Sequence, residues 1–321
     1  SMSILVYIES NQNQIKKSSF ELLSYAKELS KKLSLEVIAL VINCTNTSTL
    51  QDFGPDKILS INQTKLNLFN AQNYAELISN VSKSTGAKNI IISDSVNCKY
   101  LGSLLSVKIN AAFISNVVSI PSSTTPFIVK RSTFSNKAFC DIKINSDIKI
   151  LSISKNSFGV NKNKTEPIIE NIENDFIESG IIFESVELSS GSVSIEDADI
   201  VVSAGRGMKG PENWNIIEDL AKTLNAATAC SKPVSDLGWR PHSEHVGQTG
   251  KPVSSNLYIA IGISGAIQHL AGVSSSKVKV VINTDPEAPF FKVADYGIVG
   301  DAFDVVPKLN EKLKVFQAEN N

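Results

Sequence analysis

The chain is 321 residues long, more than one hydrophobic core usually serves, so the sequence predicts two domains. Lysine and arginine total 31 against 32 aspartates and glutamates, and this balance excludes the basic surface expected of a nucleic-acid-binding protein. No apolar run reaches the roughly 18 residues of a membrane-spanning helix, so we expect a soluble, cytoplasmic protein without membrane insertion. The four cysteines stand far apart and form no metal or CxxC motif.

The first half of the chain alternates short apolar runs with helical patterns. Strands are expected at Ser3–Glu9, Glu36–Asn43, Lys57–Asn62 and Asn89–Ser95. Helices are expected over residues 20–33 and 71–84, where apolar residues recur at helical spacing. Strand–helix–strand units of this kind favour a largely parallel, Rossmann-like sheet.

A change of pattern marks the end of this domain. Residues 112–157 are rich in β-type segments, which we expect to add strands to the edge of the parallel sheet. Leu188–Asp197, with the sequence LSSGSVSIED, is rich in serine and glycine and is predicted to be the linker. The expected domains are therefore residues 1–187 and residues 188–321, both of the α/β class.

The second half repeats the alternation. Strands are expected at Asp199–Ser203, Ala226–Ser231, Asn256–Ile263, Lys277–Asn283 and Asp295–Val299. Helices are expected over Asn213–Asn225 and Ala266–Ala271, and from Phe303 onward. Ligands of open α/β sheets bind where the carboxyl ends of the strands meet, so the segments that follow these strands are the candidate site.

Residues Gly205–Gly210, GRGMKG, match the GxGxxG pattern of dinucleotide-binding turns and follow an expected strand. The acidic residue that should end the next strand and bind a ribose is missing, since Cys230 stands there. We interpret the segment as a glycine-rich turn and not as a nicotinamide site, with Arg206 placed for a phosphate or flavin contact.

The strand that contains Tyr258 breaks at Gly262–Gly265, GISG, and becomes a helix within two residues. Small residues let a ligand approach the backbone, and the free amides at a helix start favour an anion. A tight strand-to-helix turn would explain the glycines as well, but it does not explain the polar pair Gln268 and His269 in an otherwise apolar helix. We expect an anion site at this turn.

Two further segments supply polar groups. The loop His245–Gly250, HVGQTG, combines two flexible glycines with Gln248 and Thr249, although an ordinary polar loop would look the same. Asn283 and Asp301 come at the ends of the last two expected strands. Because all these positions fall at strand ends, the sequence predicts that they converge on one site.

Catalytic and metal-binding interpretations find little support. His242 and His245 are spaced as a metal pair, but they sit in a loop and the only other histidine is His269, so a solvated loop fits better. The segment around Ser264 lacks the second glycine of a hydrolase elbow, and no other nucleophile pattern is present. We expect no catalytic residues and no metal.

Taken together, SAGRG at 203–207, HVGQTG at 245–250, IGISGAIQHLAG at 261–272 and the segment from INTDPEAP to ADYGIVGD over 282–301 resemble the electron transfer flavoprotein alpha-subunit family. The likeness is specific in the C-terminal domain and merely compatible in the N-terminal one. It implies an N-terminal domain similar to adenine-nucleotide hydrolases, a flavodoxin-like C-terminal domain that binds FAD, and a heterodimer with the electron transfer flavoprotein beta subunit.

The resemblance also implies where FAD is held. The helix start at Ser264 would serve its phosphate and ribityl region, Thr249 would reach the flavin N5 edge, and His269 would donate a hydrogen bond or a positive charge to the N1/C2 edge. The positions carried over are Arg206, Ser231, Lys232, Val246, Gly247, Gln248, Thr249, Ser264, Gly265, Ala266, Ile267, Gln268, His269, Asn283 and Asp301. Many family members have arginine at the position of Lys232, so this chain keeps the charge there but loses the planar guanidinium.

The function implied is that of a bacterial electron carrier without substrate chemistry of its own. Its FAD would accept electrons from dehydrogenases such as the acyl-CoA dehydrogenases of fatty acid beta-oxidation and pass them towards a membrane quinone reductase. Two alternatives stay open. One is the NADH-linked, flavin-bifurcating form of the family, and the other is an α/β interaction subunit with a vestigial cofactor site, which would give a colourless complex.

Overall fold

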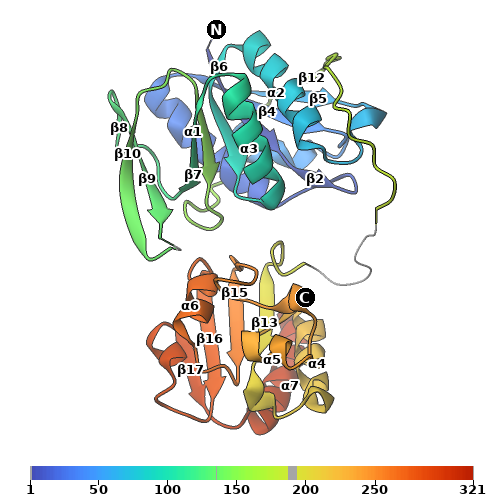
Figure 1. Ribbon diagram of the computed structural model, residues 1–321, viewed down its shortest axis with the longest axis vertical. Coiled ribbons are helices and arrows are strands. Elements are labelled where there is room, and N and C mark those ends of the chain that lie inside the picture. Colours follow the sequence, from blue (N-terminus) through green and yellow to red (C-terminus); the bar gives the residue numbers. More distant parts are fainter. Residues whose placement is uncertain (1, 135, 187–193, 321) are drawn as a thin grey trace. The chain divides into compact units, whose positions relative to one another are not determined.

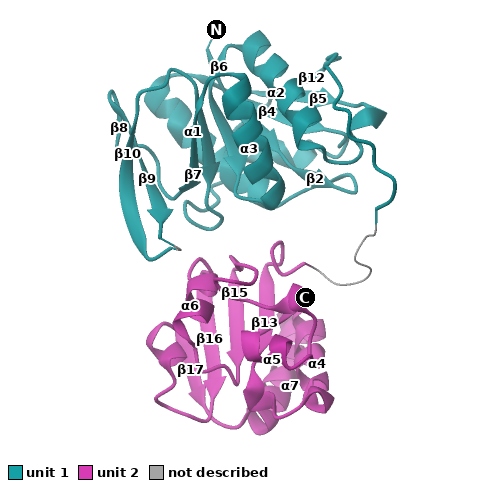
Figure 2. Ribbon diagram, viewed as in Figure 1, with its two compact units in different colours: residues 1–186 teal, residues 187–321 magenta. Residues whose placement is uncertain are grey.

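A computed structural model describes residues 2–134, 136–186 and 194–320, which fall into two compact units, residues 1–186 and 187–321 (Figures 1 and 2). Each unit is built on its own largely parallel sheet, so the predicted α/β class is confirmed for both. Most of the expected linker, residues 188–193, lies outside the described residues. Its last part is not a linker, because Ile195 is buried in the core of the second unit.

The sheet of the N-terminal unit has the strand order β10-β9-β7-β11-β6-β1-β4-β5-β12, with β8 beside β9. Strand β9 pairs antiparallel with β7, β8 and β10, and the strands from β7 to β12 along this order pair in parallel. The strands are β1 (Ser3–Ile8), β4 (Glu36–Ile42), β5 (Lys57–Ile61), β6 (Ala87–Ser93), β7 (Ala112–Val117), β8 (Ser123–Thr124), β9 (Phe127–Thr133), β10 (Ala138–Ile144), β11 (Lys149–Ile153) and β12 (Ile168–Asn171). A separate small hairpin joins β2 (Ser10–Asn11) and β3 (Gln14–Ile15).

Helices cover both faces of this sheet because its central strands are apolar on both sides. In β1, Ile4, Val6 and Ile8 face one helix layer, and the alternate residues Leu5 and Tyr7 face the other. Helix α1 (Ser18–Leu33) packs on the first face, and helices α2 (Ala71–Thr85) and α3 (Val96–Lys108) pack on the second. The result is a three-layer domain.

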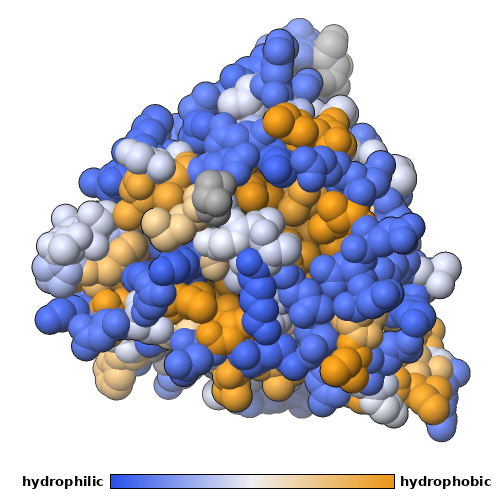
Figure 3. Space-filling model, turned by 90° about the horizontal axis from the view of Figure 1, so that it is seen from above, coloured by the Kyte–Doolittle hydropathy of each residue, from blue (hydrophilic) through white to orange (hydrophobic). Residues whose placement is uncertain are grey.

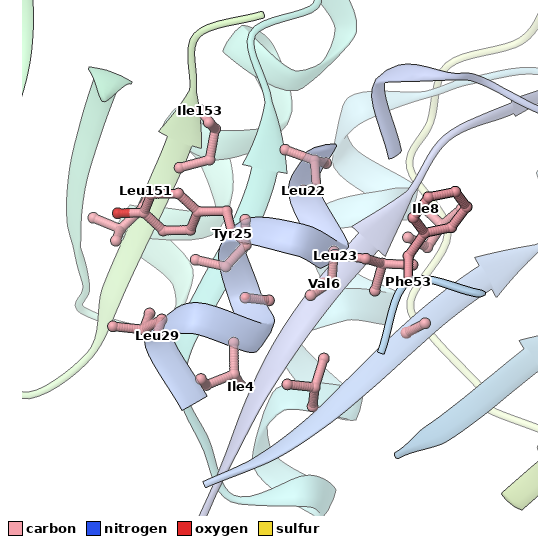
Figure 4. Packing of buried hydrophobic residues seen from close by; sticks show 14 of the residues in the cluster. Ile4, Val6, Ile8, Leu22, Leu23, Tyr25, Leu29, Phe53, Leu151 and Ile153 are labelled. Carbon is pink, nitrogen blue, oxygen red and sulfur yellow. The ribbon is translucent and has the colours of Figure 1, made fainter. Parts of the chain in front are cut away.

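Figure 4 shows the packing beneath α1. Leu23 of α1 lies beside Val6 of β1, and Tyr25 reaches towards Leu151 of β11. The hydroxyl of Tyr25 donates a hydrogen bond to the backbone oxygen of Ser119 at 3.0 Å, so this buried phenol is satisfied inside the core.

The structure corrects two expectations about this unit. Helix α3 was not predicted, because Val96, Tyr100 and Val107 on its exposed side are apolar and obscure the helical period. Strand β11 lies between β6 and β7 inside the sheet, so the segment 112–157 does more than extend the sheet edge. The parallel pairing of β11 across a long connection leaves no local sequence signal.

The sheet of the C-terminal unit is parallel throughout and has the order β14-β13-β15-β16-β17. Numbered within the unit this is the order 2-1-3-4-5 of flavodoxin-like domains, which confirms the expected fold. The strands are β13 (Ile200–Ala204), β14 (Ala227–Cys230), β15 (Leu257–Ile261), β16 (Val278–Asn283) and β17 (Tyr296–Val299). The helices are α4 (Asn215–Leu224), α5 (Lys232–Asp236), α6 (Ile267–Val273) and α7 (Ala302–Asn320).

This sheet too is covered on both faces. Helices α4 and α7 pack on the face that carries Val202 and Ile259, and α6 packs on the face that carries Val201 and Tyr258. The predicted elements of this unit are all present, with ends shifted by at most two residues. The alternation of buried side chains along β13 and β15 therefore fixes which residues lie next to α6.

The surface of the molecule seen in Figure 3 is mostly hydrophilic, and its hydrophobic patches are separated by hydrophilic side chains. All four cysteines are free. Within the described ranges, the chain has no helix whose length and apolar character would let it span a membrane.

Candidate cofactor site

The carboxyl ends of the parallel strands in the C-terminal unit form a single edge. The strand order reverses between β13 and β15, and such a switch point is where open α/β sheets bind ligands. Arg206 follows β13, Ser264 follows β15, Asn283 ends β16 and Asp301 follows β17. The structure thus brings these four predicted positions to the same edge, in the order of the strands.

At the switch point two glycine turns touch through their backbones. Gly262 has a φ of +63°, and its carbonyl oxygen accepts a hydrogen bond from the amide of Gly207 at 3.2 Å. A Cβ added to Gly207 would lie 2.6 Å from the Cα of Gly262, so neither turn has room for a side chain. Close approach of two loops therefore accounts for the first glycines of the GRGMKG segment.

The segment does not form the helix start that a dinucleotide fingerprint requires. Residues Arg206–Met208 make a short 3-10 turn, and helix α4 begins only at Asn215. The interpretation of GRGMKG as a glycine-rich turn agrees with this geometry. Arg206 follows the end of β13 and its side chain is exposed to solvent.

A cleft of about 300 Å³ opens between the ends of β13, β15, β16 and β17. It is lined by Gly207, Lys209, Gly262, Ile282, Asn283, Thr284, Gly300, Asp301 and Ala302. One carboxylate oxygen of Asp301 accepts the amide of Phe303 at 2.9 Å in the first turn of α7, and the other lies 3.9 Å from the Nζ of Lys209. This volume is at the lower end of small-molecule sites and would hold part of a large cofactor.

The turn before α6 is open to solvent at the same edge. Gly265 has a φ of +93°, and a Cβ there would lie 2.8 Å from the amide nitrogen of Phe290. Ser264, Ala266 and Ile267 are exposed, and no side chain in the described part of the chain caps the start of α6. The predicted anion site is therefore a turn with accessible backbone, held in shape by the packing of Gly265 on Phe290.

The loop Val246–Thr249 is fastened onto α6. The amide of Gln248 donates to the backbone oxygen of Gln268 at 2.8 Å, and the amide of Val246 donates to the oxygen of Cys230 at 3.0 Å. Gly247 packs so closely on α6 that a Cβ at Gly272 would lie 2.7 Å from its Cα. The structure thus brings the predicted loop and the predicted helix together, with Gln248 and Thr249 exposed beside Gln268.

His269 is buried under this loop. Its Nε2 lies 2.8 Å from the hydroxyl of Tyr258, while its Nδ1 is buried and has no hydrogen-bond partner among the described residues. Burial lowers the pKa of His269 to about 4, and the nearby His245 adds to this shift. The backbone of Val246 acts in the opposite direction, although its geometry is not that of a normal hydrogen bond to Nδ1. His269 is therefore neutral near pH 7, which favours the predicted hydrogen-bonding role over the predicted positive charge.

The side chain of Lys232 is turned towards its own helix. Its Nζ contacts both carboxylate oxygens of Asp236, at 3.0 and 2.8 Å, and both side chains are about half exposed. Ser231 is held by its amide, which donates to the oxygen of Ala204 at 3.1 Å. The charge of Lys232 is thus partly neutralised by a neighbouring acid.

Sequence reasoning missed Lys209 and Tyr258. Lys209 has a φ of +69°, and its Nζ lies 4.9 Å from the ring centre of Phe303, over the cleft that also contains Asp301. Lys209 lies inside the GRGMKG segment, so its charge next to the glycines was an available signal. His242 bonds Ser235, and no group of three or more histidine, cysteine or acidic side chains in the described ranges is placed to bind a metal.

Comparison with known proteins identifies the family. Residues 4–175 match the electron transfer flavoprotein domain, and residues 194–274 match the electron transfer flavoprotein FAD-binding domain. The chain is 33% identical to the electron transfer flavoprotein subunit alpha of Bacillus subtilis over 97% of both chains. It is 32% identical to the subunit alpha of Pseudomonas aeruginosa over 97% of this chain and 99% of the relative. It is 36% identical to the mitochondrial subunit alpha of Oryza sativa subsp. indica over 76% of this chain and 70% of the relative. The chain therefore belongs to the electron transfer flavoprotein alpha-subunit family, and its C-terminal unit carries the FAD-binding domain of that family.

Proposed function

We propose that this chain is the FAD-holding subunit of a soluble one-electron carrier in the bacterial cytoplasm. The observation that supports this best is the convergence, at one switch point, of a glycine-walled cleft, an open turn and a loop fastened to α6. The carrier would accept electrons from dehydrogenases such as the acyl-CoA dehydrogenases of beta-oxidation and deliver them to a membrane quinone reductase. When bound, FAD supplies the redox chemistry.

The chemistry of the edge suggests which part of FAD each segment holds. The carboxylate of Asp301 would repel a phosphate but accepts hydrogen bonds from hydroxyl groups, so the cleft suits the adenosine end. The exposed backbone at Ser264–Ile267 suits the phosphates and the ribityl chain. The loop Val246–Thr249 and His269 would then border the flavin ring, and the unpartnered Nδ1 of His269 is a buried donor site that such a ring would complete.

FAD binding should depend on the C-terminal unit alone. A chain that begins near Leu188, produced with its partner subunit, should keep its flavin, because every proposed contact lies beyond Gly205. The measurement is the ratio of flavin absorbance to protein in the purified complex. Flavin that instead followed residues 1–187 would contradict the proposed site.

The complete protein should be a heterodimer with a related α/β beta subunit, since a shuttle cofactor at an open edge needs cover on its outer side. Light scattering of the native complex should give about twice the mass of this chain, and FAD should stabilise that complex by mass action. A stable, flavin-loaded monomer would exclude this arrangement.

Replacing His269 by alanine should lower the one-electron potential of the bound flavin. A hydrogen bond to a charged group is worth about 1.5 to 3 kcal/mol, and about 1.4 kcal/mol corresponds to about 59 mV for one electron, so we expect a fall of roughly 60 to 130 mV. FAD content should stay mostly intact because the phosphates are held elsewhere. The measurement is a potentiometric titration of the heterodimer.

His242→Ala is the matched control for that substitution, because His242 is an exposed histidine of the same unit that bonds Ser235. It should leave the potential unchanged. If His269→Ala also leaves the potential unchanged but lowers stability, His269 serves only the core.

A further inference from the structure

Tyr258 is the second residue of β15 and contacts His269 of the proposed flavin site. Its side chain is fully buried, and its ring stacks on Phe290 with 6.2 Å between ring centres and an angle of 4° between planes. Phe290 in turn donates its amide to the backbone oxygen of Ser264 at 3.0 Å. A rigid strand and a stacked ring therefore hold the Tyr258 hydroxyl in place, 2.8 Å from the Nε2 of His269.

The positions of the protons on Tyr258 and His269 decide which of the two donates the hydrogen bond. A phenol in a core must donate its proton to an acceptor, and burial raises the pKa of Tyr258, so the phenol stays protonated. Among the described residues, His269 Nε2 is its one partner of normal geometry, since the buried Ser203 hydroxyl makes no such bond. Tyr258 then donates to Nε2, and the single proton of the neutral imidazole must sit on Nδ1.

We propose that Tyr258 is a positioning residue that fixes His269 in the tautomer protonated on Nδ1, so that this nitrogen is a hydrogen-bond donor towards the ligand. The inference rests on the proposed function, in which the N1/C2 edge of the flavin lies beside His269. That edge consists of acceptors, so the opposite tautomer would set a lone pair against a lone pair. The unpartnered, buried Nδ1 is the atom that this arrangement leaves to be satisfied.

The other groups around His269 do not fix the position of its proton. His245, from the loop side, is the titratable neighbour, and it disfavours a second proton on His269. The backbone of Val246 also lies on that side. With the ring neutral at pH 7, the position of its one proton depends on hydrogen bonding, and among the described residues Tyr258 is the partner of normal geometry.

The test is ¹⁵N NMR of the heterodimer labelled at histidine, compared with its Tyr258→Phe variant. The chain has only 3 histidines, and His242→Ala and His269→Ala assign the signals. In the wild type we expect His269 to show a protonated Nδ1 and an unprotonated Nε2. In Tyr258→Phe, which keeps the stacked ring, the other tautomer should become populated, and formation of the one-electron-reduced flavin should become three- to tenfold less favourable.

Tyr25→Phe is the matched control, since it removes a buried tyrosine hydroxyl from the core of the N-terminal unit. It should change neither the tautomer nor the potential. A wild-type His269 protonated on Nε2, or an unchanged tautomer in Tyr258→Phe, would overturn the inference even in a protein that holds FAD. Absence of FAD from the wild-type complex would instead contradict the proposed function, and the tautomer would still be readable in that protein.

Discussion

Replacing Gly262 by valine should remove FAD from the protein and lower the free energy of unfolding of the C-terminal unit by about 2 to 5 kcal/mol. Gly262 has a φ of +63°, which costs an L-residue about 1 to 2 kcal/mol. A Cβ there would also lie 2.9 Å from the Cα of Gly207, and forcing atoms into a packed contact costs about 1 to 3 kcal/mol more. Because this contact joins the ends of β13 and β15, the cleft walls would move apart.

Gly238→Val is the control that separates the effect of backbone strain from the effect of the steric clash. Gly238 has a φ of +73° but no atom of the described residues within 4 Å of an added Cβ, so the control carries the backbone strain without the clash. It should unfold at a slightly lower denaturant concentration and keep its FAD. The measurements are the denaturation midpoint and the flavin-to-protein absorbance ratio, and a Gly262→Val protein that matched the control in both would contradict the proposed role of the switch point.

Glu21→Ala should destabilise the N-terminal unit by about 2 to 4 kcal/mol. Glu21 is a buried acid of α1, and its carboxylate accepts the amides of Asn156 at 2.7 Å, Phe158 at 3.0 Å and Gly159 at 2.6 Å. Hydrogen bonds to a charged group are worth about 1.5 to 3 kcal/mol each, but part of this is recovered when the freed loop amides reach water. The carboxylate thus fixes the loop that leaves β11.

Glu28→Ala, in the same helix, is the control for Glu21. Glu28 forms an exposed ion pair with Lys31, and the loss of such a pair changes stability by less than about 1 kcal/mol. Thermal or chemical unfolding of both variants makes the comparison. Equal stability of the two proteins would show that Glu21 is not an anchor, and FAD content should be unchanged in both because they lie in the other unit.

The fold was largely predictable where burial leaves a local pattern. The strands around Ile4 and Tyr258 read as apolar runs, and the strand-to-helix order implied parallel sheets. Helix α3 escaped prediction because Tyr100 and Val107 are apolar on its solvent side. The place of β11 between β6 and β7 was also out of reach, because strand order in a parallel sheet is set by long connections.

The candidate site was predictable as a set of positions but not as a set of contacts. That Arg206 and Asn283 share an edge follows from parallel strands alone. That Gly207 is needed because it touches Gly262 depends on residues 55 positions apart in the sequence (262 minus 207), which no local motif shows. The contact between Tyr258 and His269 joins a strand to the following helix, and the burial that lowers the pKa of His269 comes from packing that the sequence does not show.

An anaerobic dithionite titration of the chain purified with its beta subunit tests the central claim most directly. The proposed one-electron carrier predicts the absorbance bands of oxidised FAD at about one flavin per heterodimer, and a one-electron-reduced form that accumulates midway through the titration. NADH should not replace dithionite in reducing it. A complex without flavin bands would contradict the account.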